Sequence, residues 1–289
     1  MSVVREGSGG LFDRIEQALG LTPMRATPVA GGCVGEVFRI DLQDGERCVA
    51  KVDPCASGTL DLEGRMLEAL APHLPVPAVL HAAPDLLVME FLEGSSDFSP
   101  GAERHAAELV AALHEVGADR CGFDHDTLIG GLPQVNPWED SWLTFFAEHR
   151  LIGMARQCRE HRRIDGAMFE RVARLADRVG DHLDEPSRPS LLHGDLWAGN
   201  VLSQGDRITG FLDPAVSYGH PEIELAFTTL FSSFGQAFFD RYDELRPIAP
   251  GFDEERRHLY NLYPLLVHAR LFGGGYVGSV DRTLARFGC

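Results

Sequence analysis

The 289-residue sequence predicts an α+β fold with two lobes, a small β-rich N-terminal lobe and a larger helical C-terminal lobe. Two patterns support this prediction. Short apolar runs of strand length, separated by polar turns, fill most of residues 1–93. Longer segments with apolar positions at helical spacing dominate the chain from residue 102 onward. We therefore divide the chain into domains 1–93 and 94–289.

The clearest local signal in the first domain is a β-hairpin, in which two strand-like runs flank the polar, glycine-containing turn at residues 43–46. The second domain is expected to consist mostly of helices, interrupted by one short apolar–turn–apolar segment. The expected elements are a helix at 11–20, strands at 27–32, 35–42 and 47–53, a helix at 59–71, strands at 76–82 and 86–92, helices at 102–116, 139–157 and 167–183, the interrupted segment at 191–213, and further helices to the C-terminus.

The charge balance excludes two classes of partner. The chain has 26 basic and 43 acidic residues, a formal net charge of −17. Nucleic acids and anionic membranes bind proteins that present basic surfaces, so we expect no nucleic acid and no membrane as partner. Six scattered cysteines without a C-x-x-C pair indicate reduced thiols and no zinc site. Because the N-terminal segment also lacks the apolar stretch of a signal peptide, we expect a cytoplasmic protein, monomeric or homodimeric.

Lys51 is the only lysine among the 26 basic residues. Arginine can replace lysine on most surfaces, but ammonium is a compact charge whereas guanidinium is a broad planar fork. A chain that otherwise uses only arginine is expected to need an ammonium group at this position.

A phosphoryl-transfer site is indicated by residues 193–200, HGDLWAGN, together with Asp213 at the end of the apolar run ITGFL. Phosphoryl transfer needs Mg²⁺ held by oxygen ligands and a carboxylate directed at the attacking hydroxyl group. We assign Asp195 as the catalytic base and Asn200 and Asp213 as the metal ligands. ATP and Mg²⁺ are the cofactors that this chemistry implies.

The first domain contains the matching nucleotide-binding elements. Gly32 and Gly35 have the spacing of the end of a glycine-rich phosphate loop, and Lys51 follows on the next strand. We expect Lys51 to pair with Glu63 on the following helix, with Glu68 as the second choice. The strand that contains Met89, Glu90 and Phe91 is expected to offer backbone groups to the adenine ring.

At this point the sequence resembles the fructosamine kinases (ketosamine-3-kinases), relatives of the aminoglycoside and choline phosphotransferases within the protein-kinase-like fold. The resemblance covers about residues 11–278. It depends on GGCVGEVFRI, IGGLPQVNPWEDSW, FFAEHRL, LLHGDLWAGNV, FLDPAVSYGHPEIELAF and YNLYPLLVHARLFGGGY. Protein kinases would show HRD and DFG instead of HGD and DPA.

The resemblance implies an ATP-dependent kinase that phosphorylates the 3-hydroxyl group of ketosamines, small molecules or glycated proteins, so that the amine is released. It implies the same roles for Asp195, Asn200, Asp213, Lys51 and Glu63. It further suggests that Trp197 contacts the sugar, that Glu224, where relatives often have Asp, braces the catalytic loop, and that Cys33 could act as a redox switch.

Three alternatives stay open. The first is a kinase of another small alcohol, such as an aminoglycoside, choline or homoserine, because these enzymes share the catalytic residues. The second is a pseudokinase that only binds nucleotide, although such modules usually lack at least one of the residues that are intact here. The third is a protein kinase, which Trp197, Asp213-Pro214-Ala215 and the lack of an APE segment disfavour.

Overall fold

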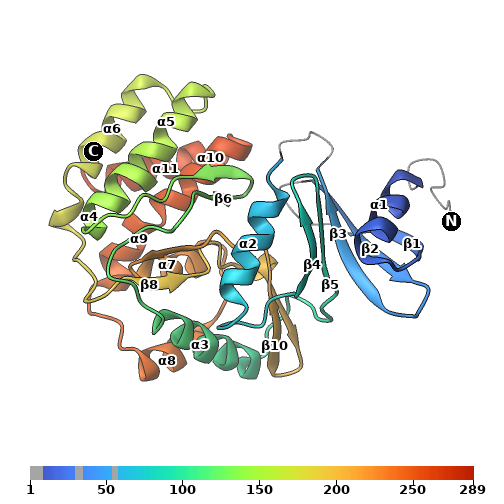
Figure 1. Ribbon diagram of the computed structural model, residues 1–289. Helices are drawn as coiled ribbons and strands as arrows, with labels where there is room; N and C mark the ends of the chain where they lie inside the picture. The colour runs from blue at the N-terminus through green and yellow to red at the C-terminus, as the bar shows by residue number, and fades with distance from the viewer. Residues whose placement is uncertain (1–8, 30–34, 54–57) are drawn as a thin grey trace.

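The computed structural model describes residues 9–29, 35–53 and 58–289 and confirms a mixed α+β fold with a β-rich N-terminal lobe and a helical C-terminal lobe (Figure 1). The N-terminal lobe contains one antiparallel sheet of five strands in the order β1-β2-β3-β5-β4. Its elements are α1 (Gly9–Leu19), β1 (Pro23–Pro28), β2 (Glu36–Leu42), β3 (Arg47–Val52), α2 (Leu60–Leu70), β4 (Val79–Ala83) and β5 (Leu86–Glu90).

The sheet buries both of its faces, and this places Lys51. Successive side chains of a strand point to opposite faces. Leu86 and Val88 of β5 pack with Ile15 of α1 on one face, whereas Leu87 and Met89 pack on the α2 side. Lys51 of β3 pairs with Leu87, so its side chain points toward α2. Figure 1 shows α1 and α2 on opposite sides of the sheet.

The C-terminal lobe is built around one apolar core in which the rings of Trp142, Phe146 and Tyr260 lie 5.3–6.1 Å apart. Its regular helices are α3 (Pro100–His114), α4 (Trp142–Phe145), α5 (Gly153–Glu160), α6 (Gly166–Ala176), α7 (Glu222–Leu230), α8 (Gln236–Leu245), α9 (Arg257–Tyr260), α10 (Leu262–Phe272) and α11 (Gly275–Arg286). Its strands are β6 (Thr127–Ile129), β7 (Leu132–Gln134), β8 (Ser190–Leu192), β9 (Val201–Gln204), β10 (Arg207–Phe211) and β11 (Ser217–Gly219). Single turns of π- or 3₁₀-helix occur at Phe146–Ile152, Val179–Asp181, Ala198–Asn200 and Phe252–Arg256.

The connection between the lobes is attached to the second lobe. Backbone hydrogen bonds join Ser95 to Ser203 of β9 in both directions, at 3.0 and 2.8 Å. The helical part of the chain then begins at α3, where the Ser99 hydroxyl accepts the Ala102 amide and so caps the helix. The lobe boundary at 93/94 stays a prediction.

Two local expectations differ from the structure. The first strand lies at Pro23–Pro28 and so begins before the expected residue 27, because pairing with β2 begins at Pro23 opposite Leu42; residues 30–32 of the expected range lie outside the described residues. The β6–β7 hairpin and β11 were not expected, since each has only three residues and no strong alternation. Across the part of the chain that the structure describes, no helix is long and apolar enough to cross a membrane.

Candidate active site

A buried ion cluster joins the two lobes. The Lys51 ammonium of β3 lies 2.6 Å from Glu63 of α2 and also contacts Asp213, which is 162 residues away in the chain. The Lys51 and Glu63 side chains are buried, while the Asp213 side chain is about one third exposed. Glu68, the second choice as partner, is exposed on α2. The cluster therefore holds one cation between two carboxylates at the meeting point of the lobes.

The three charges determine each other's protonation. Burial would lower the pKa of Lys51, but the carboxylates of Asp213 and Glu63 outweigh it and raise the pKa, so the ammonium stays charged. Burial raises the pKa of Glu63, whereas the Lys51 ammonium overcomes burial at Asp213 and lowers its pKa. Asp213 is therefore the carboxylate of this cluster that is held most firmly in its ionised form.

Asp195 lies in the segment between β8 and β9, with one side of its carboxylate fixed. The Asn200 amide nitrogen donates to Asp195 Oδ2 and to the Asp195 carbonyl, both at 2.9 Å. No described residue donates to Asp195 Oδ1, which leaves that oxygen free to accept a proton. Burial, followed by the negative charge of Asp213, raises the pKa of Asp195 to about 7.

The orientation of Asn200 also leaves its side-chain oxygen available. Its amide nitrogen is used by Asp195, and no described residue donates to its Oδ1. Asp213 adopts a left-handed backbone conformation (φ 51°), which is rare outside glycine and is often found at functional sites. Together Asn200 and Asp213 supply the hard oxygen atoms that Mg²⁺ prefers, which is a suitable pair because Mg²⁺ usually takes one or two protein ligands.

A chain of buried hydrogen bonds to α7, α3 and α8 supports the catalytic loop, residues 193–200. Glu224 of α7 accepts the Gly194 amide at 2.6 Å, and its other oxygen lies 2.9 Å from His114 Nε2 of α3. The His114 Nδ1 atom lies 2.7 Å from the Tyr242 hydroxyl of α8. Gly194 has φ 85°, and a Cβ there would lie 2.0 Å from the Ala215 carbonyl oxygen, so this position requires glycine.

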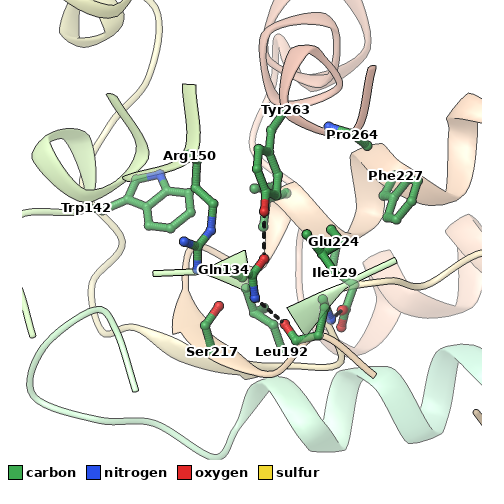
Figure 2. A pocket seen from close by; sticks show the side chains of 13 residues that line it. Ile129, Gln134, Trp142, Arg150, Leu192, Ser217, Glu224, Phe227, Tyr263 and Pro264 are labelled. Atoms are coloured by element: carbon green, nitrogen blue, oxygen red, sulfur yellow. Dashed lines mark hydrogen bonds between the residues drawn. The ribbon is translucent and has the colours of Figure 1, made fainter. Parts of the chain in front are cut away.

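Hydrogen bonds from the β6–β7 hairpin hold the segment that follows Asp213. The Gln134 amide donates to the Ala215 carbonyl at 2.9 Å, and the Tyr263 hydroxyl of α10 donates to the Gln134 side-chain oxygen at 2.7 Å. Figure 2 shows both bonds beside a small cavity of about 20 Å³, large enough for about one water molecule. Thr127 adds a bond to the Val216 carbonyl at 3.2 Å. The hairpin therefore fixes the backbone immediately after the strained Asp213.

Arg150 is a buried cation without a carboxylate partner among the described residues. It donates to the Val135 carbonyl at 2.8 Å and to the Asn136 side-chain oxygen at 2.7 Å. Its guanidinium carbon lies 4.4 Å from the centre of the Phe145 ring. Burial lowers the pKa of Arg150. In Figure 2 it lies beside Gln134, so it supports the same hairpin.

The structure describes only some of the residues that were expected to bind the nucleotide. Gly32 and Cys33 lie outside the described residues. Gly35 has φ 77°, and a Cβ there would lie 2.4 Å from the Val52 carbonyl oxygen, so glycine is required just before β2.

Met89 and Glu90 end β5, and Phe91 follows at the exit from the sheet. Met89 is buried and Glu90 exposed. The Glu90 amide donates to the Ala78 carbonyl at 2.8 Å, and the Arg47 guanidinium carbon lies 4.7 Å from the centre of the Phe91 ring. The Glu90 amide is therefore already used within the sheet.

Trp197 lies on the partly exposed side of the catalytic loop. Its indole ring covers Gly199, where an added Cβ would be 2.4 Å from the ring, and its centre lies 5.7 Å from that of Phe231. The Ala198 amide donates to the Ser233 hydroxyl at 2.9 Å. The loop is thus tied to the chain segment that follows α7.

A family model of the fructosamine kinases matches residues 13–287, nearly the whole chain. The chain belongs to the fructosamine kinase family. A Synechocystis protein named "Probable ketoamine kinase" is 39% identical over 271 residues, covering 89% of this chain and 88% of the relative. The mouse ketosamine-3-kinase is 33% identical, covering 92% and 96% of the two chains.

Solved structures agree with this assignment. A Thermobifida fusca protein assigned as a fructosamine-3-kinase has a TM-score of 0.85 and 29% identity, with 95% of this chain and 97% of that chain covered. The aminoglycoside phosphotransferase APH(4)-Ia, solved with ADP and hygromycin B, shares the fold with a TM-score of 0.65 at 18% identity, covering 96% of each chain. The fructosamine kinase fold is therefore the phosphotransferase fold expected from the sequence.

Several residues of this site were not assigned by sequence reasoning. Gln134, Arg150 and Tyr263 lie in stretches that supported the family resemblance, but nothing in their local pattern indicated a role. His114 is a buried histidine of α3, and nothing in its local pattern indicated its bond to Glu224. Their hydrogen-bond partners lie 7 to 129 residues away in the chain.

We expect Lys51→Arg to lower kcat at least about tenfold although it preserves the charge, because a planar guanidinium cannot replace a compact ammonium between Glu63 and Asp213. Steady-state kinetics with ATP would measure this effect. Arg65→Lys, the reverse exchange at an exposed position of α2, is the matched control and should leave kcat unchanged. Near-normal turnover of the Lys51 variant would contradict this interpretation of the single lysine.

We expect Glu224→Met to lower the free energy of unfolding by about 2 kcal/mol or more, because it leaves the Gly194 amide and the His114 ring without their acceptor. Denaturant unfolding would measure the loss, and kcat should fall as well because the catalytic loop loses its brace. Glu68→Met on the exposed face of α2 is the control. Equal stability of the two variants would show that Glu224 does not brace the loop.

Proposed function

We propose that this protein is an ATP-dependent kinase that phosphorylates the 3-hydroxyl group of ketosamines, the adducts of reducing sugars with amines. The observation that supports this most directly is the cluster of Lys51, Asp195, Asn200 and Asp213 in a member of the fructosamine kinase family. Two relatives named ketoamine and ketosamine kinases match most of the chain. Release of the amine after phosphorylation would make the activity a deglycation.

In this proposal Asp195 is the catalytic base. Its free Oδ1 accepts the proton of the attacking hydroxyl group, and a pKa raised to about 7 makes it a better proton acceptor than an ordinary aspartate. Asn200 holds the other oxygen, Oδ2, and so orients the carboxylate. Lys51, kept in place by Glu63, directs its ammonium at the nucleotide phosphates.

We assign Mg²⁺ to Asn200 Oδ1 and the Asp213 carboxylate. The ion, when bound, neutralises charge on the phosphoryl oxygens. Asp213 suits this role because its pKa is lowered and its carboxylate stays ionised, and because its left-handed backbone is held by the bonds to the Ala215 and Val216 carbonyls. On the nucleotide side we assign Gly32 and Gly35 to the phosphates and Met89, Glu90 and Phe91 to the adenine ring.

The proposed setting is the cytoplasm. Cys48, Cys121 and Cys158 are buried free thiols, and burial raises their pKa to about 11, 12 and 12. Thiols with such pKa values are poor nucleophiles, in agreement with structural roles for these three cysteines in reduced form.

The proposal is tested by ATP- and Mg²⁺-dependent phosphorylation of a panel: a ribulosamine, a fructosamine, kanamycin, choline and no acceptor. We expect transfer to ketosamines alone, with the phosphate on the 3-hydroxyl group. Transfer to kanamycin or choline would assign the enzyme to another small alcohol. Nucleotide binding without transfer to any acceptor would favour a nucleotide-binding module.

We expect Asp195→Asn to lower kcat by about three powers of ten or more, because the amide cannot accept the hydroxyl proton. The dissociation constant of ATP, measured by calorimetry, should stay within about threefold of the wild-type value, since Lys51 and the metal ligands are intact. Asp206→Asn, on the turn between β9 and β10, is the matched control. Substantial turnover by the Asp195 variant would require a different base.

A further inference from the structure

Five aromatic rings form a continuous strip from the catalytic loop to the end of α10 and the start of α11. We define the aromatic strip by these residues, in order of contact: Trp197, Phe231, His268, Phe272 and Tyr276. Neighbouring ring centres lie 5.7, 5.0 and 5.7 Å apart along the strip, and Tyr276 lies 4.9 Å from His268. These are the separations of aromatic contact.

None of these side chains is buried, and Phe272 is 55% exposed. Large aromatic side chains are rarely this exposed, and Phe272 extends the aromatic surface that the other four rings form. The last turn of α10, which carries Phe272, is held by Arg163. Its guanidinium donates to the Arg270 carbonyl at 3.1 Å and to the Leu271 carbonyl at 3.3 Å.

The turn between α10 and α11 brings the outer rings together. Gly273 and Gly274 have φ values of 65° and 57°, a left-handed conformation that glycine adopts without steric cost. This reversal places the rings of Phe272 and Tyr276 6.1 Å apart. The turn between α10 and α11 therefore determines how Phe272 and Tyr276 are arranged at the outer end of the strip.

His268 contributes to the strip as a neutral ring. Its Nδ1 atom lies 2.7 Å from the Pro264 carbonyl, which can only accept, so Nδ1 carries the proton. Burial lowers the pKa of His268. An uncharged imidazole does not repel the ammonium of an amine substrate, and the faces of the neighbouring rings attract it.

The inner end of the strip is adjacent to the proposed base. Trp197 is two residues beyond Asp195, and the bond from the Ala198 amide to Ser233 ties the catalytic loop to the segment that contains Phe231. The chain therefore brings the inner end of the strip to the loop that carries Asp195.

We propose that the rings of the aromatic strip beyond Trp197 form the subsite for the amine portion of the ketosamine, and that they select amines with an apolar or aromatic substituent. This inference rests on the proposed function. A ketosamine has two parts, and the sugar must present its hydroxyl group to Asp195, so the amine substituent is the part that reaches the strip.

The test compares two adducts of the same ketose, one with benzylamine and one with methylamine. We expect the wild-type protein to have the higher kcat/KM for the benzylamine adduct. Phe272→Ala should lower this kcat/KM about tenfold, since it removes an aromatic contact worth about 1–2 kcal/mol, and should change the value for the methylamine adduct less than about twofold. Leu245→Ala, at the exposed end of α8, is the matched control and should change neither.

Equilibrium binding of the two adducts without nucleotide provides a second measurement that does not depend on turnover, and the same selective loss is expected there. Equal losses for both adducts, or no loss, would overturn the inference while the proposed function stands. A wild-type protein that binds ATP but phosphorylates neither adduct would overturn both.

Discussion

The active site depends on one buried interaction, the contact of the Lys51 ammonium with carboxylates from two different parts of the chain. Glu63 lies on α2 of the N-terminal lobe and Asp213 at the end of β10 in the C-terminal lobe. Burial of an unpaired charge is costly, so the ammonium favours the arrangement in which both carboxylates reach it. The sheet alternation that directs Lys51 toward α2 is thus a condition for the relative placement of the lobes.

The C-terminal lobe meets a second constraint, which is to hold Asp213 in a left-handed conformation. This is achieved by hydrogen bonds to the backbone just beyond it, from Gln134 and Thr127. Tyr263 orients Gln134, and Arg150 supports the chain beside the hairpin. Several buried polar groups, each with a hydrogen-bond partner, thereby offset the free-energy cost of the strained backbone.

The sequence predicted the parts of the site that follow from local spacing. Asp195 and Asn200 are five residues apart in one loop, and Lys51 and Glu63 lie on a strand and on the helix that follows it. Their proximity could therefore be inferred from a short stretch of chain. The α+β class followed for the same reason, because strand and helix periodicity are local properties.

The supporting residues could not be inferred in this way. His114 meets Glu224 across 110 residues, and Tyr263 meets Gln134 across 129. Contacts of this kind result from tertiary packing and leave no periodic trace near either partner. The three-residue strands of the β6–β7 hairpin are held in part by distant partners such as Tyr263 and the Ala215 and Val216 carbonyls, and so they too escaped prediction.

The pairing of Ser95 with Ser203 joins the connection between the lobes to the strand that follows Asn200. Asn200 lies immediately before β9, and the connecting segment is hydrogen-bonded to that same strand in both directions. A displacement of the connecting segment would therefore have to break these two hydrogen bonds or carry β9 with it. The connection between the lobes and the Asn200 amide that holds Asp195 thus belong to one hydrogen-bonded unit.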